Sequence, residues 1–130
     1  MPNTDAPFTT LVVDGDSYLN NGLGKFLEAE GHQVITATDP KDVIEKVRQH
    51  LPDMILVNIE SKGIVGLDLL AEMLLVNPHA SVILMAGRSR ISEAVEAIKA
   101  GAVDYLEWPL DLDKLKQAIE AQKQLSKKKP

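Results

Sequence analysis

Residues 52–58 read Pro-Asp-Met-Ile-Leu-Val-Asn, a short apolar run that follows a turn signal and ends on an amide side chain. The run Met54–Val57 is too short for a helix of ordinary length, and runs of this kind are typical of strands buried on both faces of a parallel sheet. Asn58 would stand at the carboxyl end of that strand. Ligands bind at this edge of open α/β sheets, so the sequence directs attention to Asn58 and its neighbours.

Strands and helices alternate along the rest of the chain. The other predicted strands are Thr9–Asp14, Gln33–Ala37, Ser81–Ala86 and Val103–Glu107. Helices are expected over about 17–30, 40–51, 67–76 and 89–100, and from residue 112 onward. In the helix 89–100, the apolar residues Ile91, Val95 and Ile98 recur at helical spacing, which predicts that they face the core.

Turn residues mark several helix ends. Asp39 is predicted to cap the second helix, with Pro40 at the first helical position, where its missing N–H costs nothing. Asp111 is a second candidate N-cap. Gly31 and Gly101 are expected to end their helices in the left-handed conformation that glycine tolerates best.

Five strands joined by short helical crossovers indicate one α/β domain, a doubly wound parallel sheet covered on both faces by right-handed connections. The expected strand order is 2-1-3-4-5, the flavodoxin-like order, with a crevice at the ends of the first and third strands. Asp14 and Asn58 would face each other across it. We expect the domain to span residues 9–124, with an N-terminal tail at 1–8 and a basic tail or linker start at 125–130.

Composition restricts the class of function. The chain has 130 residues, a net charge of −5 and no cysteine, which excludes disulfides and thiolate metal sites. An acidic chain gains nothing from the counterion release that drives nucleic-acid binding, so we expect no direct contact with DNA or RNA. No stretch approaches the ~20 apolar residues of a membrane helix. We expect a cytoplasmic protein, and a surface role for His32, His50 and His79, which lack ligand spacing.

Five short motifs follow one another along the chain in an order and spacing that resemble those of a known family. They are Leu-Val-Val-Asp at 11–14, Pro-Asp-Met-Ile-Leu-Val at 52–57, Gly66, Ala-Gly-Ala at 100–102, and Asp-Tyr-Leu at 104–106 followed by Pro109. Over about Thr9–Gln122 the chain resembles the receiver domain of bacterial two-component response regulators. The stretch Glu93–Leu115 is most similar to receivers attached to AAA+ transcriptional activators.

The resemblance implies a phosphorylation site, and the residues depart from it. Receivers accept a phosphoryl group from a histidine kinase on an aspartate that ends the third strand, beside paired acids that hold Mg²⁺. Here Asn58 stands at the nucleophile position, and Gly15 replaces the second acid after Asp14. Ala86 replaces the hydroxyl residue that ends the fourth strand, and Trp108 replaces the lysine after the fifth. We therefore expect no catalytic residue, no enzymatic activity, and weak or absent Mg²⁺ binding.

Each crevice residue also has a simpler interpretation. Asn58 could be a strand-end cap, and Trp108 could pack at the sheet edge instead of filling the crevice. Asp14 could accept N–H bonds from the backbone or from Trp108, or could bind metal. Asp16 and Glu60 are the remaining acids that could rebuild a cation site.

The hypothesis from sequence is an atypical receiver in two-component phosphorelay signalling, a pseudo-receiver that works by binding. Tyr105 keeps the aromatic switch position on the fifth strand, and the expected interface is the surface of helix 4, strand 5 and helix 5. Expected partners are a kinase, an effector, an attached output domain or a second copy. Two alternatives remain open: a small molecule bound in the vacated crevice, or the receiver of a transcriptional activator with an unusual phospho-acceptor. Flavin binding is disfavoured because the loop Asp14–Asp16 lacks the glycines and hydroxyls that cradle phosphate.

Overall fold

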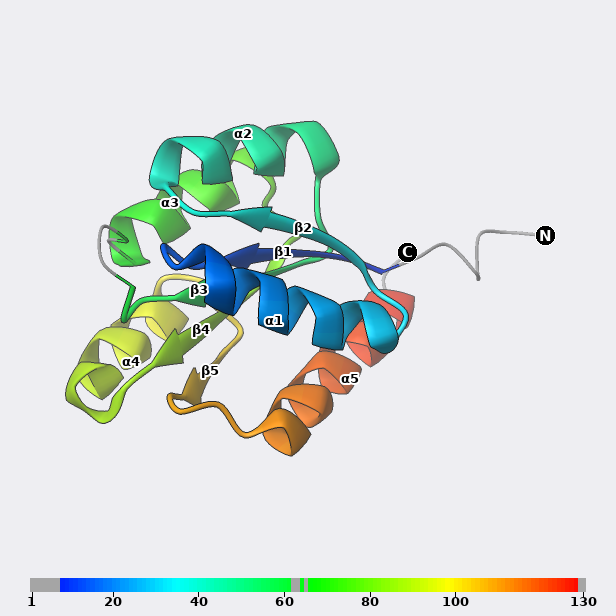
Figure 1. Cartoon of the computed structure of the whole chain (residues 1–130). Coiled ribbons are helices and arrows are strands. Elements are labelled where there is room, and N and C mark those ends of the chain that lie inside the picture. The colour runs from blue at the N-terminus through cyan, green and yellow to red at the C-terminus, as the bar shows by residue number, and fades with distance from the viewer. Residues whose placement is uncertain (1–7, 62–63, 65, 129–130) are drawn as a thin grey trace.

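The computed structural model describes residues 8–61, 64 and 66–128 (Figure 1). Its strands form one parallel sheet in the order β2-β1-β3-β4-β5, which confirms the predicted flavodoxin-like topology. The strands are β1 Thr9–Val13, β2 Gln33–Ala37, β3 Met54–Asn58, β4 Ser81–Ala86 and β5 Asp104–Glu107. The helices are α1 Ser17–Ala29, α2 Pro40–His50, α3 Gly66–Val76, the 3-10 turn η1 Arg88–Arg90, α4 Ile91–Lys99 and α5 Leu112–Lys128.

The strand β3 lies at the centre of the sheet and is buried along its whole length. Its neighbours are β1, where Val57 pairs with Val13, and β4, where Val57 pairs with Leu84. This register places Asn58 beside Met85 and at the level of Asp14, the residue that follows β1. The predicted meeting of Asp14 and Asn58 at one sheet edge thus follows from strand pairing.

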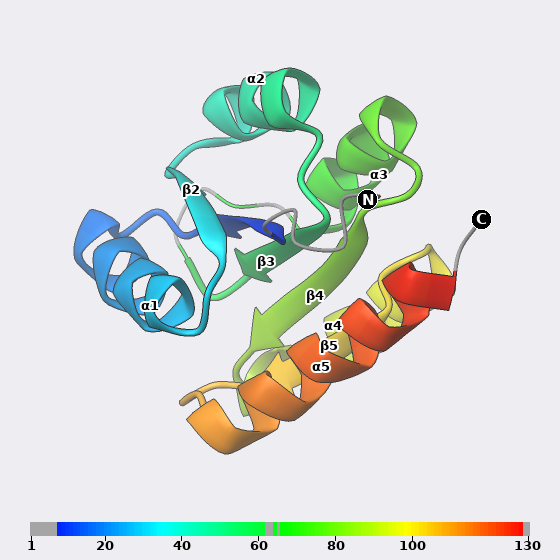
Figure 2. The same cartoon turned by 90° about the vertical axis from the view of Figure 1, so that its right-hand side faces the viewer.

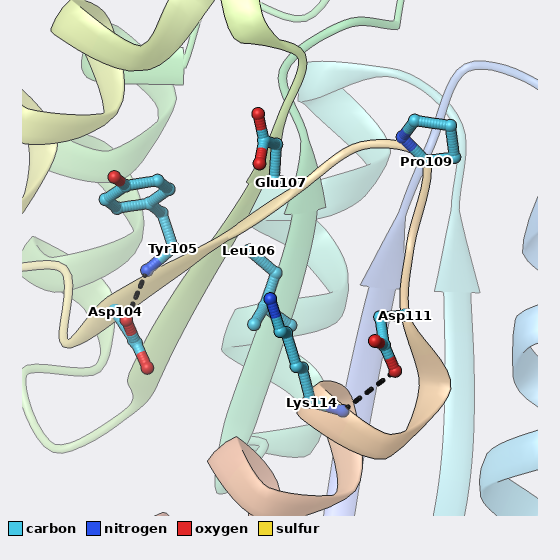
Figure 3. Close-up of a pocket in the computed structure, with 7 residues that line it drawn as sticks. All are labelled: Asp104, Tyr105, Leu106, Glu107, Pro109, Asp111 and Lys114. Atoms are coloured by element: carbon cyan, nitrogen blue, oxygen red, sulfur yellow. Dashed lines mark hydrogen bonds between the residues drawn. The ribbon is translucent and has the colours of Figure 1, made fainter.

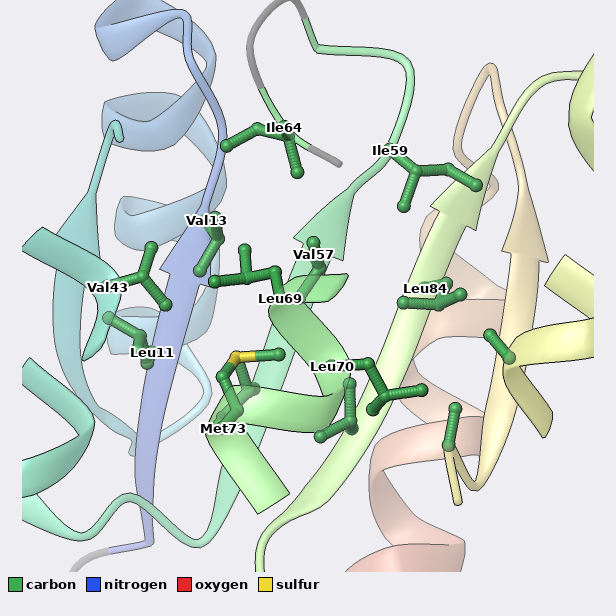
Figure 4. Packing of buried hydrophobic residues seen from close by; sticks show 14 of the residues in the cluster. Leu11, Val13, Val43, Val57, Ile59, Ile64, Leu69, Leu70, Met73 and Leu84 are labelled. Carbon is green, nitrogen blue, oxygen red and sulfur yellow. The ribbon is translucent and has the colours of Figure 1, made fainter. Parts of the chain in front are cut away.

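Side chains alternate between the two faces of the sheet, as the pleat requires. One face, with Leu11, Val57 and Leu84, packs against α2, α3 and α4 (Figure 4). The opposite face, with Leu56 and Ile83, packs against α1 and α5. Figure 2 shows α5 running diagonally across the sheet near β4, on the side away from α2 and α3. The sheet is therefore covered on both faces, which explains why its inner strands are almost continuously apolar.

The predicted helix ends are confirmed. The Asp39 side chain accepts the N–H of Asp42 at 2.9 Å, and Pro40 is the first residue of α2. Gly31 and Gly101 have φ angles of 92° and 121°, the left-handed region that favours glycine. Space matters at Gly101 as well, because a Cβ there would lie 2.7 Å from Leu74 Cδ1.

The helix α4 is rotated relative to the prediction. It buries the small residues Ala94 and Ala97, while Val95 and Ile98 are 40% and 39% exposed. The expectation that Val95 and Ile98 face the core is therefore wrong. Alanines on the inner side let a helix approach the sheet closely, and periodicity alone could not choose between two apolar stripes on the same helix. Two larger apolar side chains are left on the solvent side.

A surface role for His32 is also wrong, because the imidazole is buried at the amino-terminal side of the sheet. Its Nδ1 lies 2.9 Å from Thr10 Oγ1, and the Phe8 ring packs edge-on at a centroid distance of 5.4 Å. The Lys123 ammonium lies 5.5 Å from the centre of the Phe8 ring. Burial and the charge of Lys123 lower the pKa of His32 below 6.5.

The last helix is longer than expected. Backbone helix continues to Lys128, so residues 125–128, where a basic tail or the start of a linker was expected, are helical. The predicted tails at 1–7 and 129–130 lie outside the described residues, whereas Phe8 packs on the core. Within the described part of the chain, no helix has the length and apolar character needed to cross a membrane.

Candidate functional site

Asp14 and Asn58 form the centre of the crevice. The Asn58 side-chain Nδ2 donates a hydrogen bond of 2.8 Å to Asp14 Oδ2, and the two side chains are buried. The Asn58 Oδ1 accepts the backbone N–H of Glu60 at 3.0 Å. These two contacts fix the amide orientation, because its oxygen must face an N–H donor and its NH₂ must face the carboxylate. Asn58 therefore presents donors, and no lone pair, to Asp14.

The other groups around Asp14 are donors too. Its Oδ1 accepts the backbone N–H of Asp16 at 2.9 Å. The buried Asn20 side chain donates to the Asp14 carbonyl at 2.9 Å and to the Ala37 carbonyl at 3.0 Å, which ties the start of α1 to the ends of β1 and β2. Sequence reasoning missed Asn20, since an asparagine on an amphipathic helix gives no signal of such a role.

The loop after β3 closes the crevice from the other side. The Ser61 hydroxyl accepts the backbone N–H of Gly15, so this loop is bonded to the β1–α1 loop. The Glu60 carboxylate reaches the β4–α4 loop, where its Oε2 accepts the N–H of Gly87 at 2.9 Å. Ala86, the last residue of β4, is fully buried. The contact from Glu60 to Gly87 was not predicted, because it joins residues far apart in the sequence.

Trp108 lies toward α1. It is half-buried and packs on the apolar cluster of α1 and α5, near Leu23, Phe26 and Leu110. Its backbone N–H donates to the Ala86 carbonyl at 2.8 Å. A cavity of about 550 Å³ lies between α1 and the start of α5; it is lined by Asp14, Asn21, Gly22, Leu23, Lys25, Phe26, Trp108, Leu110 and Leu112. The Trp108 ring is therefore less buried than a ring that filled the crevice would be.

Tyr105 is half-buried and packs on the core cluster that includes α4. It also lines a second cavity, of about 410 Å³, between β5 and the beginning of α5 (Figure 3). Three carboxylates line this cavity, those of Asp104, Glu107 and Asp111, while the Lys114 side chain points from α5 toward β5. Asp111 is the predicted N-cap of α5, and its Oδ1 accepts the Asp113 N–H at 2.9 Å.

The crevice does not fit a magnesium ion. Mg²⁺ takes oxygen ligands and is usually held by one or two carboxylates with waters. Both oxygens of Asp14 accept hydrogen bonds, and Asn58 turns its NH₂ group toward that carboxylate. Among the described residues, no group of three His, Cys, Asp or Glu side chains is placed to hold a metal ion.

Comparison with known families decides the classification. The model of the response regulator receiver domain matches residues 10–120, most of the chain. The chain belongs to the receiver family. Receivers are signalling domains, not enzymes. In this chain Asp14 directly follows β1 and Tyr105 lies on β5.

Related receivers are found in longer transcriptional regulators. The chain is 39% identical over 109 residues to the transcriptional regulatory protein ZraR of Klebsiella oxytoca, covering 84% of this chain and 25% of the relative. It is 32% identical over 107 residues to the nitrogen assimilation regulatory protein NtrX of Azorhizobium caulinodans, covering 81% and 24%. The receiver thus spans about a quarter of the length of these curated relatives.

Solved receiver structures resemble this one closely. A response regulator receiver domain protein from Clostridium thermocellum superposes with a TM-score of 0.86 at 26% identity, covering 92% of this chain and 96% of the other. NtrX from Brucella abortus gives a TM-score of 0.85 at 30% identity, covering 93% of this chain and 28% of that one.

Proposed function

We propose that this receiver acts without being phosphorylated, as a binding domain whose crevice is closed by its own side chains. The observation that carries the proposal is the hydrogen bond from Asn58 to Asp14. An amide at the nucleophile position is a poor acceptor of a phosphoryl group. Its NH₂ group also donates to Asp14 Oδ2, an oxygen of the one acid that remains to hold a cation at this position.

The other crevice residues support the same proposal. Phosphoryl transfer depends on positioned positive charge and hydrogen-bond donors. Gly15 supplies no second carboxylate for a cation, and Ala86 supplies no hydroxyl. Trp108 packs toward α1 in place of a mobile lysine. Four groups that phosphoryl transfer uses in this family, the nucleophilic aspartate, the second acid, the hydroxyl and the lysine, are thus all replaced, while the hydrophobic core around them is retained.

We further propose that the output is contact between proteins through the surface of α4, β5 and α5. Val95 and Ile98 are exposed on α4, and α4 contacts β5, the strand that carries the half-buried Tyr105 and lines the acidic cavity of Figure 3. The candidate partners are a kinase, an effector, an output domain of the kind that the longer relatives' names imply, or a second copy. A cytoplasmic location and the absence of direct contact with nucleic acid are part of this proposal.

Incubation with acetyl phosphate and Mg²⁺, followed by intact mass measurement, tests the first part. We expect no phosphoryl adduct on the wild type. An adduct that maps to any residue of the crevice would overturn the proposal and favour a receiver with an unusual phospho-acceptor. Adduct formation on a phosphorylatable receiver in the same tube is the control for the reagent.

The second part is tested by Ile98→Asp, with Leu75→Asp as the matched control. Leu75 is 84% exposed on α3, which is not one of the elements of the proposed surface. Sedimentation velocity over a range of concentrations measures self-association. We expect Ile98→Asp, and not Leu75→Asp, to weaken the association of the wild type. Equal behaviour of both variants would show that this surface is not the interface between copies.

A small-molecule regulator is the second candidate function, favoured by the cavity of about 550 Å³ beside Asp14. The cavity combines apolar side chains with one acid and one lysine, the mixture found in many ligand sites. Trp108 is the single tryptophan of the chain and lines the cavity. Its fluorescence therefore reports directly on occupancy in a ligand screen, and a saturable change that is lost in Phe26→Ala would support this function.

A further inference from the structure

Glu60 spans the crevice. It stands two residues after β3, and its Oε2 accepts the Gly87 N–H at 2.9 Å, directly after the end of β4. The guanidinium of Arg90 approaches the same oxygen, with Nε at 3.9 Å. The backbone N–H of Glu60 donates at the same time to Asn58 Oδ1. One residue thus joins the centre of the crevice to the loop that leads into α4.

The absence of a side chain at Gly87 leaves room for the Glu60 carboxylate. A Cβ built on Gly87 would lie 3.0 Å from both Cδ and Oε1 of Glu60. Its φ of −71° is open to any residue, so backbone conformation does not require glycine here. A methyl group at this position would instead press on the Glu60 carboxylate, the flexible end of that side chain, which would have to shift by a few tenths of an ångström.

The surroundings of the Glu60 carboxylate are those of an anion site. A backbone N–H and a guanidinium are the donors that bind carboxylates and phosphates most strongly. Arg90 also pairs with Glu93, at 3.4 Å from Nη1 to Oε1. The Glu60 side chain is only 28% exposed, so its contact with Gly87 is partly screened from water.

We propose that Glu60 is a built-in anionic ligand of this receiver: its carboxylate occupies an oxyanion site formed by the Gly87 N–H and the Arg90 guanidinium. An external oxyanion such as inorganic phosphate would be bound there if Glu60 were absent. The internal ligand ties the loop after β3 to the start of α4, and so holds the proposed interaction surface in one arrangement. This inference rests on the proposed function, because it supplies the signal that a phosphoryl group would otherwise give.

Amide hydrogen exchange and NMR titration with inorganic phosphate test the proposal on Glu60→Ala. The control is Glu93→Ala, which also removes one negative charge from Arg90 but leaves the bond to Gly87 intact. Loss of a hydrogen bond to a charged group corresponds to roughly 10- to 100-fold faster exchange of the Gly87 amide. We expect that acceleration, together with a saturable phosphate shift of the same amide, in Glu60→Ala alone.

Two results would overturn the proposal. Unchanged Gly87 exchange in Glu60→Ala would show that the contact does not hold the loop. A phosphate shift that is absent in Glu60→Ala, or equal in Glu93→Ala, would show that no oxyanion site lies under the carboxylate. Gly87→Ala is a second variant: its methyl group should displace the Glu60 side chain and accelerate exchange at the start of α4. None of these results depends on whether the wild type accepts phosphate from acetyl phosphate, so the proposed function stands or falls separately.

Discussion

The Asn58 amide nitrogen lies 2.8 Å from Asp14 Oδ2, so an amide and a carboxylate meet where two acids would repel each other. Both side chains are almost inaccessible, at 4% and 3% exposure. A hydrogen bond that involves a charged group typically contributes about 1.5–3 kcal/mol. The pair therefore stabilises the domain as well as closing its crevice.

Asn58→Asp should destabilise the fold at neutral pH, since the new carboxylate faces Asp14 without the hydrogen bond. We expect a loss of about 1.5–3 kcal/mol in urea melts. Repulsion from Asp14 should raise the folded-state pKa of the introduced carboxyl above its unfolded value. The folded state then binds more protons, so the loss should shrink as the pH falls through that raised pKa. Asn58→Ala is the control; it removes the bond without adding charge, and its loss should not shrink in this way.

Phosphorylation should not be restored by Asn58→Asp alone. The variant still lacks a second acid, a hydroxyl and a lysine, the positions now held by Gly15, Ala86 and Trp108. We expect an adduct with acetyl phosphate and Mg²⁺ only when Gly15→Asp and Trp108→Lys are added, and a larger fraction modified with Ala86→Thr. Intact mass gives the readout. Efficient labelling of the single variant would mean that Asn58 is the only obstacle in the crevice.

Trp108→Ala should have an intermediate cost. A fully buried aromatic residue loses roughly 3–5 kcal/mol on truncation, and surface changes stay within about 0.5 kcal/mol. The half-buried ring packed near Phe26 and Leu110 should fall between these limits in urea melts. Leu75→Ala is the exposed control. A Trp108→Ala loss no larger than that of the control would show that the ring does not contribute to the core.

The stability of the domain should fall as the pH drops below 6.5, because of His32. Burial lowers the folded-state pKa of His32, and Lys123 lowers it further, against smaller opposite effects of Glu30 and Glu120. The unfolded chain then binds the proton first, so stability is present above pH 6.5 and is lost below it, by up to about 1.4 kcal/mol per pH unit. His32→Asn should flatten the slope of stability against pH.

The sheet could be predicted well from the sequence because each strand and each helix end is marked by residues within that element. Buried parallel strands read as apolar runs, and residues such as Asp39 and Gly101 mark helix ends by their own conformational preferences. The facing of Asp14 and Asn58 followed from these runs and from the expected strand order. Even the edges of most elements agree within a residue or two.

What failed depends on contacts between distant segments. The rotation of α4 was decided by how closely Ala94 and Ala97 approach the sheet, which periodicity does not encode. His32 is buried because Phe8 and Lys123, from the two ends of the chain, come together over it. The Glu60 contact with Gly87 was missed for a similar reason: its only trace in the sequence is a glycine after one strand and an acid after another.

The hydrogen bond between Asn58 and Asp14 also has a consequence for how long a signalling response lasts. A phosphorylated receiver keeps its signalling state for as long as the acyl phosphate survives, so hydrolysis sets the duration of the response. In the function proposed here no covalent bond has to be made or broken. The response would instead follow the cellular amount of the protein and the dissociation rate of its partner. Control would then lie with synthesis and degradation of the chain, and its output would vary continuously with its abundance.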